Sequence, residues 1–239
     1  ATTEIYTLSL HDALPIWLYA EIARGNVPGW LHTLRPVVLS GQPAGREVRV
    51  ELWVTPDYLA VGSDEDWFLV PLTPQTAQRL ADLSGTLLPT PKLVDAIWAA
   101  ADLRLPPAPI PPSPAMTTVP VFEDHFRAVM AQRDSAGALP GRLVAGHKKD
   151  VVLTSRLAER PGKVAIYGWH RPEGAPIQPL YLGHTDRWVD YSHGIRLVGR
   201  TVTVDGVVRD LEEILGDPGL AGLVSGEGVI RPARYDGVR

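Results

Sequence analysis

The sequence predicts an α+β fold, with N-terminal helices and short strands packed on a C-terminal curved, mainly antiparallel β-sheet or partial barrel. Two Thr-Pro pairs, at 73–74 and 90–91, mark helix starts in the first half of the chain. From Arg142 onward, apolar residues recur with a period of two, which is typical of strands. Asp205-Gly206 lies between two such stretches and is a strong hairpin signal. Helices followed by a run of strands are typical of the α+β class.

Four helices are expected in the first half. The first covers 17–24 and ends at Gly25. Thr73 and Thr90 each supply a capping hydroxyl, and the helix after Thr73 ends before Gly85. The helix after Thr90 has an apolar stripe typical of core packing, made of Leu93, Val94, Ile97, Trp98, Ala101 and Leu105. The next helix has one apolar face, made of Phe122, Phe126, Val129 and Met130.

The expected strands alternate apolar and polar residues. Val48 to Val54 is the clearest of them in the first half, and two short stretches follow at 58–63 and 66–72. In the second half, strands are expected at 142–157, 163–170, 177–184, 188–198 and 200–208. A short helix is expected at 210–215, and the glycine-rich tail after it is expected to be a loop.

A proline-rich segment at 104–120 separates the two halves. It holds seven prolines, so it excludes helix and central strand and favours an extended conformation. We expect it to be an arm laid across a single domain that covers 17–239. The alternative is a linker between two domains, 17–103 and 121–239.

Composition excludes several classes of function. The chain carries 23 basic and 27 acidic residues, a net charge of −4. This near-balance argues against a nucleic-acid partner, which requires a strong basic field. No stretch approaches eighteen apolar residues, so no membrane span is expected. The absence of cysteine excludes disulfides, cysteine-ligated zinc and thiol nucleophiles.

The first sixteen residues, ATTEIYTLSLHDALPI, show neither helical nor strand periodicity. They back-translate without forcing into a sequence that resembles a common short-read sequencing adapter, read in frame. The resemblance covers all of Ala1 to Ile16, and it implies that 1–16 is an artefact outside the fold, in place of the true N-terminus and any targeting segment. The arginine, alanine, proline and glycine bias of the remainder favours a GC-rich bacterial gene. The preferred localisation is that of an exported bacterial protein.

Histidine placement is the main functional signal. His147, His170, His184 and His193 each lie in, or at the end of, a different expected strand. In the last three strands the histidine falls on the aliphatic face, near a strand end or a glycine. If the strands pair in chain order, these imidazoles converge at the rim of a buried face, where small shifts of pKa suit proton transfer or metal binding.

Three chemistries follow from this pattern. A divalent metal such as zinc is expected to use His170, His184 and His193. General acid–base catalysis is expected to use the following residues: His147, Lys149, Asp150, His170 and His193. A nucleophilic Ser192 would need a histidine from another strand, because His193 points to the opposite face of its own strand.

Aromatic side chains beside these histidines predict a ligand surface. The expected substrate-binding residues are Trp169, Trp188, Tyr191 and Arg196. The leading prediction is a hydrolase with a His-rich pocket, metal-dependent or acid–base, acting on a polar polymer such as cell-wall glycan or peptide. The alternative is a non-catalytic carbohydrate- or cell-wall-binding module. Taken singly, each of these residues is more often structural, so the prediction depends on their clustering.

Overall fold

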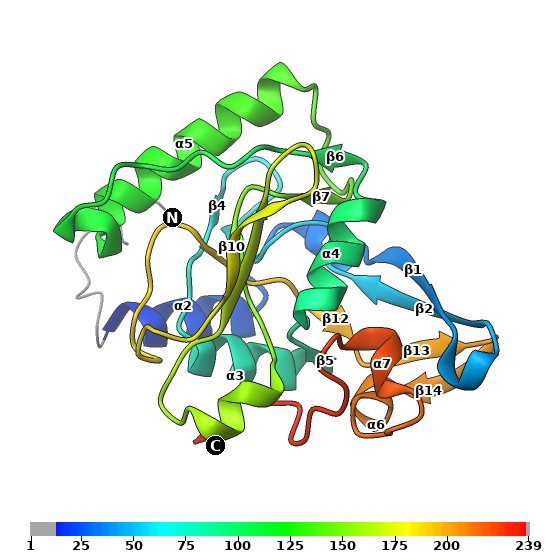
Figure 1. The fold of residues 1–239 in the computed structure, drawn as a ribbon. Helices are drawn as coiled ribbons and strands as arrows, with labels where there is room; N and C mark the ends of the chain where they lie inside the picture. The colour runs from blue at the N-terminus through cyan, green and yellow to red at the C-terminus, as the bar shows by residue number, and fades with distance from the viewer. Residues whose placement is uncertain (1–12, 238–239) are drawn as a thin grey trace.

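The computed structural model describes residues 13–237, and its longer helices lie around two β-sheets (Figure 1). The α-helices are α2 (Ala13–Ala23), α3 (Pro74–Ser84), α4 (Pro91–Ala100), α5 (Val119–Ser135), α6 (Leu211–Leu215) and α7 (Ala221–Val224). Short 3-10 turns are η1 (Gly29–His32), η2 (Pro43–Gly45), η3 (Pro114–Thr117) and η4 (Ser155–Glu159). The α7 helix lies in the tail that was expected to be a loop, so that expectation is wrong.

Helices α3 and α4 begin where their threonine caps predict. The side chain of Thr73 accepts a hydrogen bond from the backbone N–H of Thr76, and that of Thr90 accepts one from Leu93. Gly85 ends α3 in the left-handed conformation, with φ of 63°. These local signals act within one helical turn, which is why the sequence alone locates both helix starts.

Helix α2 begins earlier than expected, at Ala13 rather than Trp17. Its first turn therefore includes the last four residues of the adapter-like segment. Leu14 is only 5% exposed and belongs to the hydrophobic core together with Leu18. The structure thus includes residues 13–16 in the fold, whereas residues 1–12 lie outside the described chain. The origin of the segment stays a prediction.

The larger sheet curls into an antiparallel half-barrel, and with the N-terminal helices it gives the predicted α+β fold. Its strand order is β14-β13-β2-β12-β5, with β1 also paired to β2. The predicted Asp205-Gly206 hairpin joins β13 to β14, and both turn residues have positive φ. The strands are β1 (Arg35–Gly41), β2 (Val48–Val54), β5 (Thr86–Leu87), β12 (Val198–Gly199), β13 (Thr201–Val204) and β14 (Val207–Asp210).

The second sheet holds His170 and His193, two of the four histidines predicted to be functional, and His147 and His184 flank its strands β8 and β10. Its order is β10-β9-β8-β11, and β11 runs parallel to β8. The strands are β8 (Lys149–Val151), β9 (Ile166–His170), β10 (Pro176–Tyr181) and β11 (His193–Gly194). Pairing in chain order is therefore wrong for the last strand, because β11 adds to the β8 edge instead of following β10. Two further pairs are β3 (Ala60–Gly62) with β4 (Trp67–Leu69), and β6 (Leu103–Arg104) with β7 (Val144–Ala145).

Two expected strands are much shorter than the pattern predicts. Within 142–157 the chain forms β7 and β8, separated by Gly146, whose φ is 102°. A Cβ at Gly146 would lie 2.5 Å from the carbonyl oxygen of Leu105, so the backbone turns where only glycine fits. Within 188–198 only β11 and the start of β12 pair, because Asp190 to Ser192 form a turn.

The proline-rich segment follows the surface of the second sheet. The backbone N–H of Ile110 donates to the Tyr191 hydroxyl at 2.8 Å, and that hydroxyl lies 3.2 Å from the Ile110 carbonyl. The Tyr191 N–H donates to the carbonyl of Met116. One continuous core contains residues from both sides of the segment. The division into one or two domains stays a prediction.

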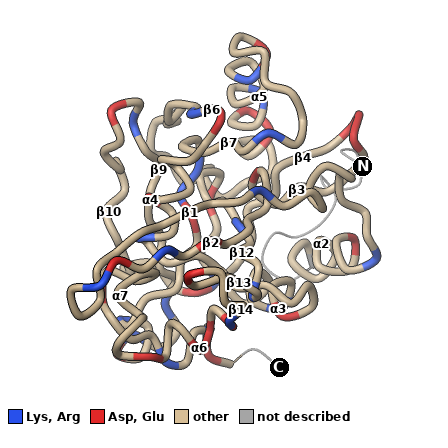
Figure 2. The backbone as a smooth tube through the Cα atoms, turned by 90° about the vertical axis from the view of Figure 1, so that its right-hand side faces the viewer, with Lys and Arg blue, Asp and Glu red and all other residues tan. Residues whose placement is uncertain are grey.

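The distribution of charged residues and the lengths of the helices can be read from the described chain. Basic and acidic residues alternate along the backbone of the described chain, without a long run of either kind (Figure 2). Among residues 13–237, every helix is too short or too polar to cross a bilayer.

Candidate functional site

Strand β9 contains a backbone irregularity that decides where its aromatic side chains lie. Gly168 and Trp169 have positive φ values of 107° and 57°. A left-handed conformation is uncommon for a bulky residue and is often found at functional sites. The indole of Trp169 lies against Lys149 and Tyr191, whereas His170 lies against Trp98 of α4. Neighbouring residues of one strand therefore serve two different clusters.

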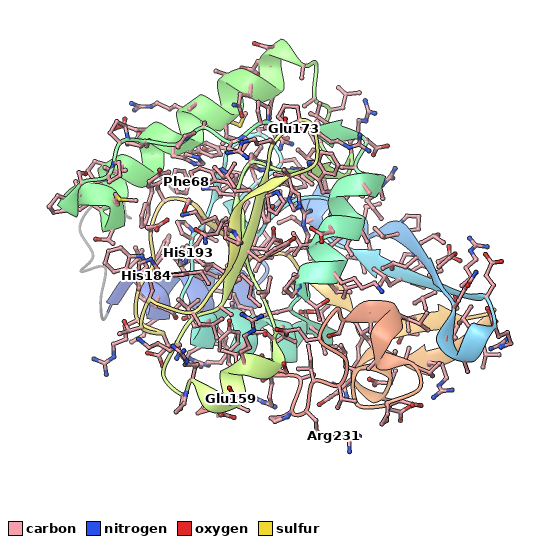
Figure 3. The ribbon with its side chains drawn as sticks, in the orientation of Figure 1. Phe68, Glu159, Glu173, His184, His193 and Arg231 are labelled. Atoms are coloured by element: carbon pink, nitrogen blue, oxygen red, sulfur yellow. The ribbon has the colours of Figure 1, made fainter. Side chains whose placement is uncertain are left out.

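The first cluster, called here the His184 cluster, consists of Lys149, His184, Asp190 and His193. The parallel β8–β11 pairing places His193 opposite Lys149. The Nε2 of His193 lies 4.0 Å from Oδ2 of Asp190. His184 follows β10 and lies close enough to His193, Asp190 and Lys149 for their charges to interact, and Figure 3 labels the two histidines in the same region. Two segments distant in sequence, β8 and 184–193, thus meet at one place.

Asp190 is held by the turn that precedes β11. Its Oδ1 accepts hydrogen bonds from the backbone N–H of Ser192 at 2.8 Å and from the Ser192 hydroxyl. Its Oδ2 accepts one from Nε1 of Trp188 at 3.3 Å. The Ser192 hydroxyl is fully buried and donates to this carboxylate, so it is a support for Asp190 in this arrangement.

The His184 cluster has a buried layer and a half-buried layer. Asp190 and His193 are 2% and 0% exposed. His184, Lys149 and Trp188 are half-buried. The ring of His184 stacks on that of Trp188, with centroids 4.7 Å apart and an angle of 10°. The Lys149 ammonium lies 4.9 Å from the centroid of the Trp169 ring.

The charges of this cluster are set by opposing effects. Burial raises the pKa of Asp190, but His193, Lys149 and the Ser192 hydrogen bonds outweigh burial and lower it to about 2. Burial lowers the pKa of His193 to about 4, although Asp190 opposes the shift. Burial also lowers the pKa of His184 and of Lys149. At neutral pH the cluster therefore combines a carboxylate with two neutral imidazoles.

Two buried basic side chains, Lys148 and His125, lie next to each other behind this cluster. The Nζ of Lys148 is 3.1 Å from Nδ1 of His125 and donates to the carbonyl of Tyr191 at 2.6 Å. Burial lowers the pKa of Lys148 to about 7. Within the described chain, several buried nitrogens here have no hydrogen-bond partner: Nε2 of His125, both ring nitrogens of His193 and Nε1 of Trp169. Such groups are rare in folded proteins, and a catalytic role is one of the explanations for them.

The second cluster surrounds His170. Its Nε2 lies 2.8 Å from Oδ1 of Asp95 in α4, and the Tyr167 hydroxyl donates to the same oxygen at 2.8 Å. The His170 ring stacks on that of Trp98 at 5.5 Å. Asp150 is buried nearby and accepts a hydrogen bond from the Tyr58 hydroxyl at 2.9 Å. Burial raises the pKa of Asp150 to about 6.

His147 and Arg196 lie in the interior. His147 is fully buried, with Nε2 3.2 Å from Oδ1 of Asp57. Asp57 also pairs with buried Arg133. The guanidinium of Arg196 is fully buried and donates to the carbonyls of Thr55 and Val144. Neither His147 nor Arg196 reaches solvent, and Trp169 and Tyr191 of the predicted ligand surface are also buried.

The predicted metal set is not assembled. His184 and His193 lie together, but His170 faces Asp95 and Trp98 instead. Within residues 13–237, no group of three or more histidine, aspartate and glutamate side chains is arranged to hold a metal ion. The reason is the strand order: β11 joins the β8 edge, so His193 is separated from β9 by β8.

Sequence alternation did not select the residues that complete the cluster. Strict alternation would place Asp190 on the face opposite His193, but a turn replaces the strand and brings the Nε2 of His193 within 4.0 Å of the Asp190 carboxylate. The available signal was the Asp-x-Ser spacing of an Asx turn, in which a carboxylate accepts from a backbone N–H two residues later. Lys148 and His125 belong to elements distant in sequence, so no local pattern connects them.

Comparisons of the chain with protein-family models, curated proteins and solved structures found no match. Function is therefore inferred from the geometry of the His184 cluster.

Proposed function

We propose that this protein is a general acid–base hydrolase that cleaves a polar polymer, such as cell-wall glycan or peptide, at the His184 cluster. One observation carries the proposal: half-buried His184 and Lys149 lie over a buried Asp190–His193 pair whose imidazole nitrogens have no hydrogen-bond partner in the described chain. Such pairs of titratable groups, held in different states, are typical of acid–base sites.

The cluster offers a group for each step of hydrolysis. Neutral His184 accepts a proton from the attacking water, and the new bond forms between the water oxygen and the substrate's electrophilic carbon. Lys149 stabilises the negative charge that develops on the substrate oxygen. The protonated His184 then donates its proton to the leaving group as the scissile bond breaks. The Asp190 carboxylate and His193 lie behind these groups and keep the interior of the site polar.

The burial of the aromatic residues favours catalysis over simple carbohydrate binding. A binding module needs exposed aromatic faces on which sugar rings can stack. Trp169 is 4% exposed and Tyr191 is 2% exposed. One face of Trp188 is covered by the ring of His184. The residues proposed for a ligand surface therefore support the walls of the His184 cluster.

Hydrolysis of soluble fragments of bacterial cell wall, with products separated by mass, tests the proposal. The wild-type protein is expected to release new products, and His184→Gln should lower the rate by about 100- to 10,000-fold, the usual contribution of a general base. His32→Gln is the matched control, because His32 is exposed on η1 and outside the cluster. An inactive wild-type protein, or equal rates for wild type and a folded His184→Gln variant, would refute the proposal.

A further inference from the structure

A separate cavity adjoins the His184 cluster. It has a volume of about 290 Å³ and lies between α2, the start of α3, the start of α5 and the loop at 185–189. Its walls are mainly apolar and include Leu18, Leu72, Phe122 and Val189. An apolar cavity of about 150 Å³ is large enough to bind benzene. The cavity therefore has room for a phenyl ring or a branched aliphatic side chain.

Trp188 connects this cavity to the proposed catalytic groups. Its side chain lines the cavity, its ring stacks on His184, and its Nε1 donates to Asp190. A ligand in the cavity is thus separated from His184 by one indole ring.

The cavity also has a cation available to a ligand. Arg187 lines it and is exposed, and no described residue forms a hydrogen bond or ion pair with its guanidinium. Thr117 and Thr185 add hydroxyl groups to the same lining. A guanidinium beside an apolar hollow suits a ligand that joins an apolar group to a carboxylate.

We propose that this cavity binds the C-terminal residue of a peptide substrate, with its large apolar side chain inside and its carboxylate on Arg187. The inference rests on the proposed function, and it selects peptide over glycan as the substrate. The preceding peptide bond then lies on the Trp188 side of the cavity, toward His184.

The α2 wall of the cavity includes Leu14 and Pro15, which belong to the adapter-like segment. The other lining residues come from the rest of the chain, including Arg187 and Trp188. A Leu14→Ala, Pro15→Ala variant should therefore keep the preference for a carboxylate. Loss of that preference in this variant while it remains folded would overturn the assignment.

Calorimetric binding of two matched probes tests the inference without requiring catalysis. N-acetyl-L-phenylalanine carries the carboxylate, and N-acetyl-L-phenylalaninamide has the same side chain without the charge. The acid should bind about 10-fold more tightly than the amide, as expected for a charge-assisted hydrogen bond. Arg187→Gln should remove this difference, and Arg171→Gln, at another exposed arginine, should preserve it.

Two variants test the apolar part of the cavity. Val189→Trp and Thr117→Phe add volume at half-buried wall positions and should weaken both probes by about 10-fold. Equal binding of acid and amide by the wild type, or unchanged binding by both folded variants, would overturn the inference. Binding without any hydrolysis refutes the proposed function alone, whereas hydrolysis of cell-wall fragments without probe binding refutes the cavity assignment alone.

Discussion

Asp57 shows how single residues in this protein maintain charge inside the core. Its side chain is 1% exposed and contacts both Arg133 and His147. Burial would raise the pKa of this carboxyl, but Arg133 and His147 outweigh burial and hold it well below its usual range. Burial lowers the pKa of His147 by more than the neighbouring Asp57 carboxylate raises it, so His147 is neutral at neutral pH. The two opposite charges that pair here are therefore those of Asp57 and Arg133.

Removing the charge of Asp57 should therefore be costly. Asp57→Asn leaves the guanidinium of Arg133 buried without its counter-ion, and we expect the free energy of unfolding to fall by about 3–5 kcal/mol. Urea denaturation measures this change. Asp124→Asn, at an exposed position that pairs loosely with Arg127, should cost less than about 1 kcal/mol. A cost for Asp57→Asn as small as that of Asp124→Asn would contradict this account.

At the scale of elements, the sequence predicts structure well where one turn of chain decides it. Thr73, Thr90 and the Asp205-Gly206 turn act through bonds to residues within a few positions, and the structure confirms all three. The four-stranded sheet is different, because its order depends on which edge remains available. The alternation around His193 carries no information on that choice, so the predicted convergence of His170 with His193 is absent.

Strand β9 contains a backbone feature that alternation does not predict. With regular pleating, Gly168 and His170 share a face and Trp169 lies on the other. The structure keeps this division, with His170 against α4 and Trp169 against Lys149 of β8, but Gly168 and Trp169 both have positive φ. Sequence could identify Gly168 as a residue able to adopt this conformation, but it could not predict the same for Trp169.

Its positive φ makes Gly168 a sensitive position. At a φ of 107°, an alanine is strained, and its Cβ would lie 3.2 Å from Cγ1 of Val94. We expect Gly168→Ala to lower the free energy of unfolding by about 2–3 kcal/mol. Gly162→Ala is the control: its φ is 70° and no atom lies within 4 Å of the added Cβ. Gly162→Ala should lower the free energy of unfolding by about 1–2 kcal/mol, from backbone strain alone. Equal losses for Gly162→Ala and Gly168→Ala in thermal denaturation would disprove the contribution of packing against Val94.

At the scale of the whole molecule, two sheets and the helices around them enclose several titratable groups in the core. Buried carboxylates, histidines, arginines and a lysine lie near the junction of α5 with the four-stranded sheet. The net stability of a folded protein is only about 5–15 kcal/mol. A single group whose protonation differs between folded and unfolded states therefore changes stability measurably.

Lys148 is the clearest such group. Burial lowers its pKa to about 7 in the folded protein, despite the opposing charges of Asp190 and Asp57, and its ordinary value is 10.5. Between these values the unfolded chain binds a proton that the folded chain does not. Stability should therefore rise with pH from 7 to 9, at up to about 1.4 kcal/mol per pH unit, and be lost again as pH falls through the folded pKa.

Chemical denaturation at pH 7, 8 and 9 measures this slope. The measurement stops at pH 9 because burial raises the pKa of Tyr58 and Tyr235, and those residues oppose the trend once unfolded tyrosines ionise. Lys148→Met should flatten the slope, leaving the smaller contribution of Lys149, whose pKa burial also lowers. Lys163→Met, which alters a lysine bonded only to the Gly183 carbonyl among described residues, should keep it. If Lys148→Met and wild type gain stability equally with pH, the lysine is not neutral in the folded core.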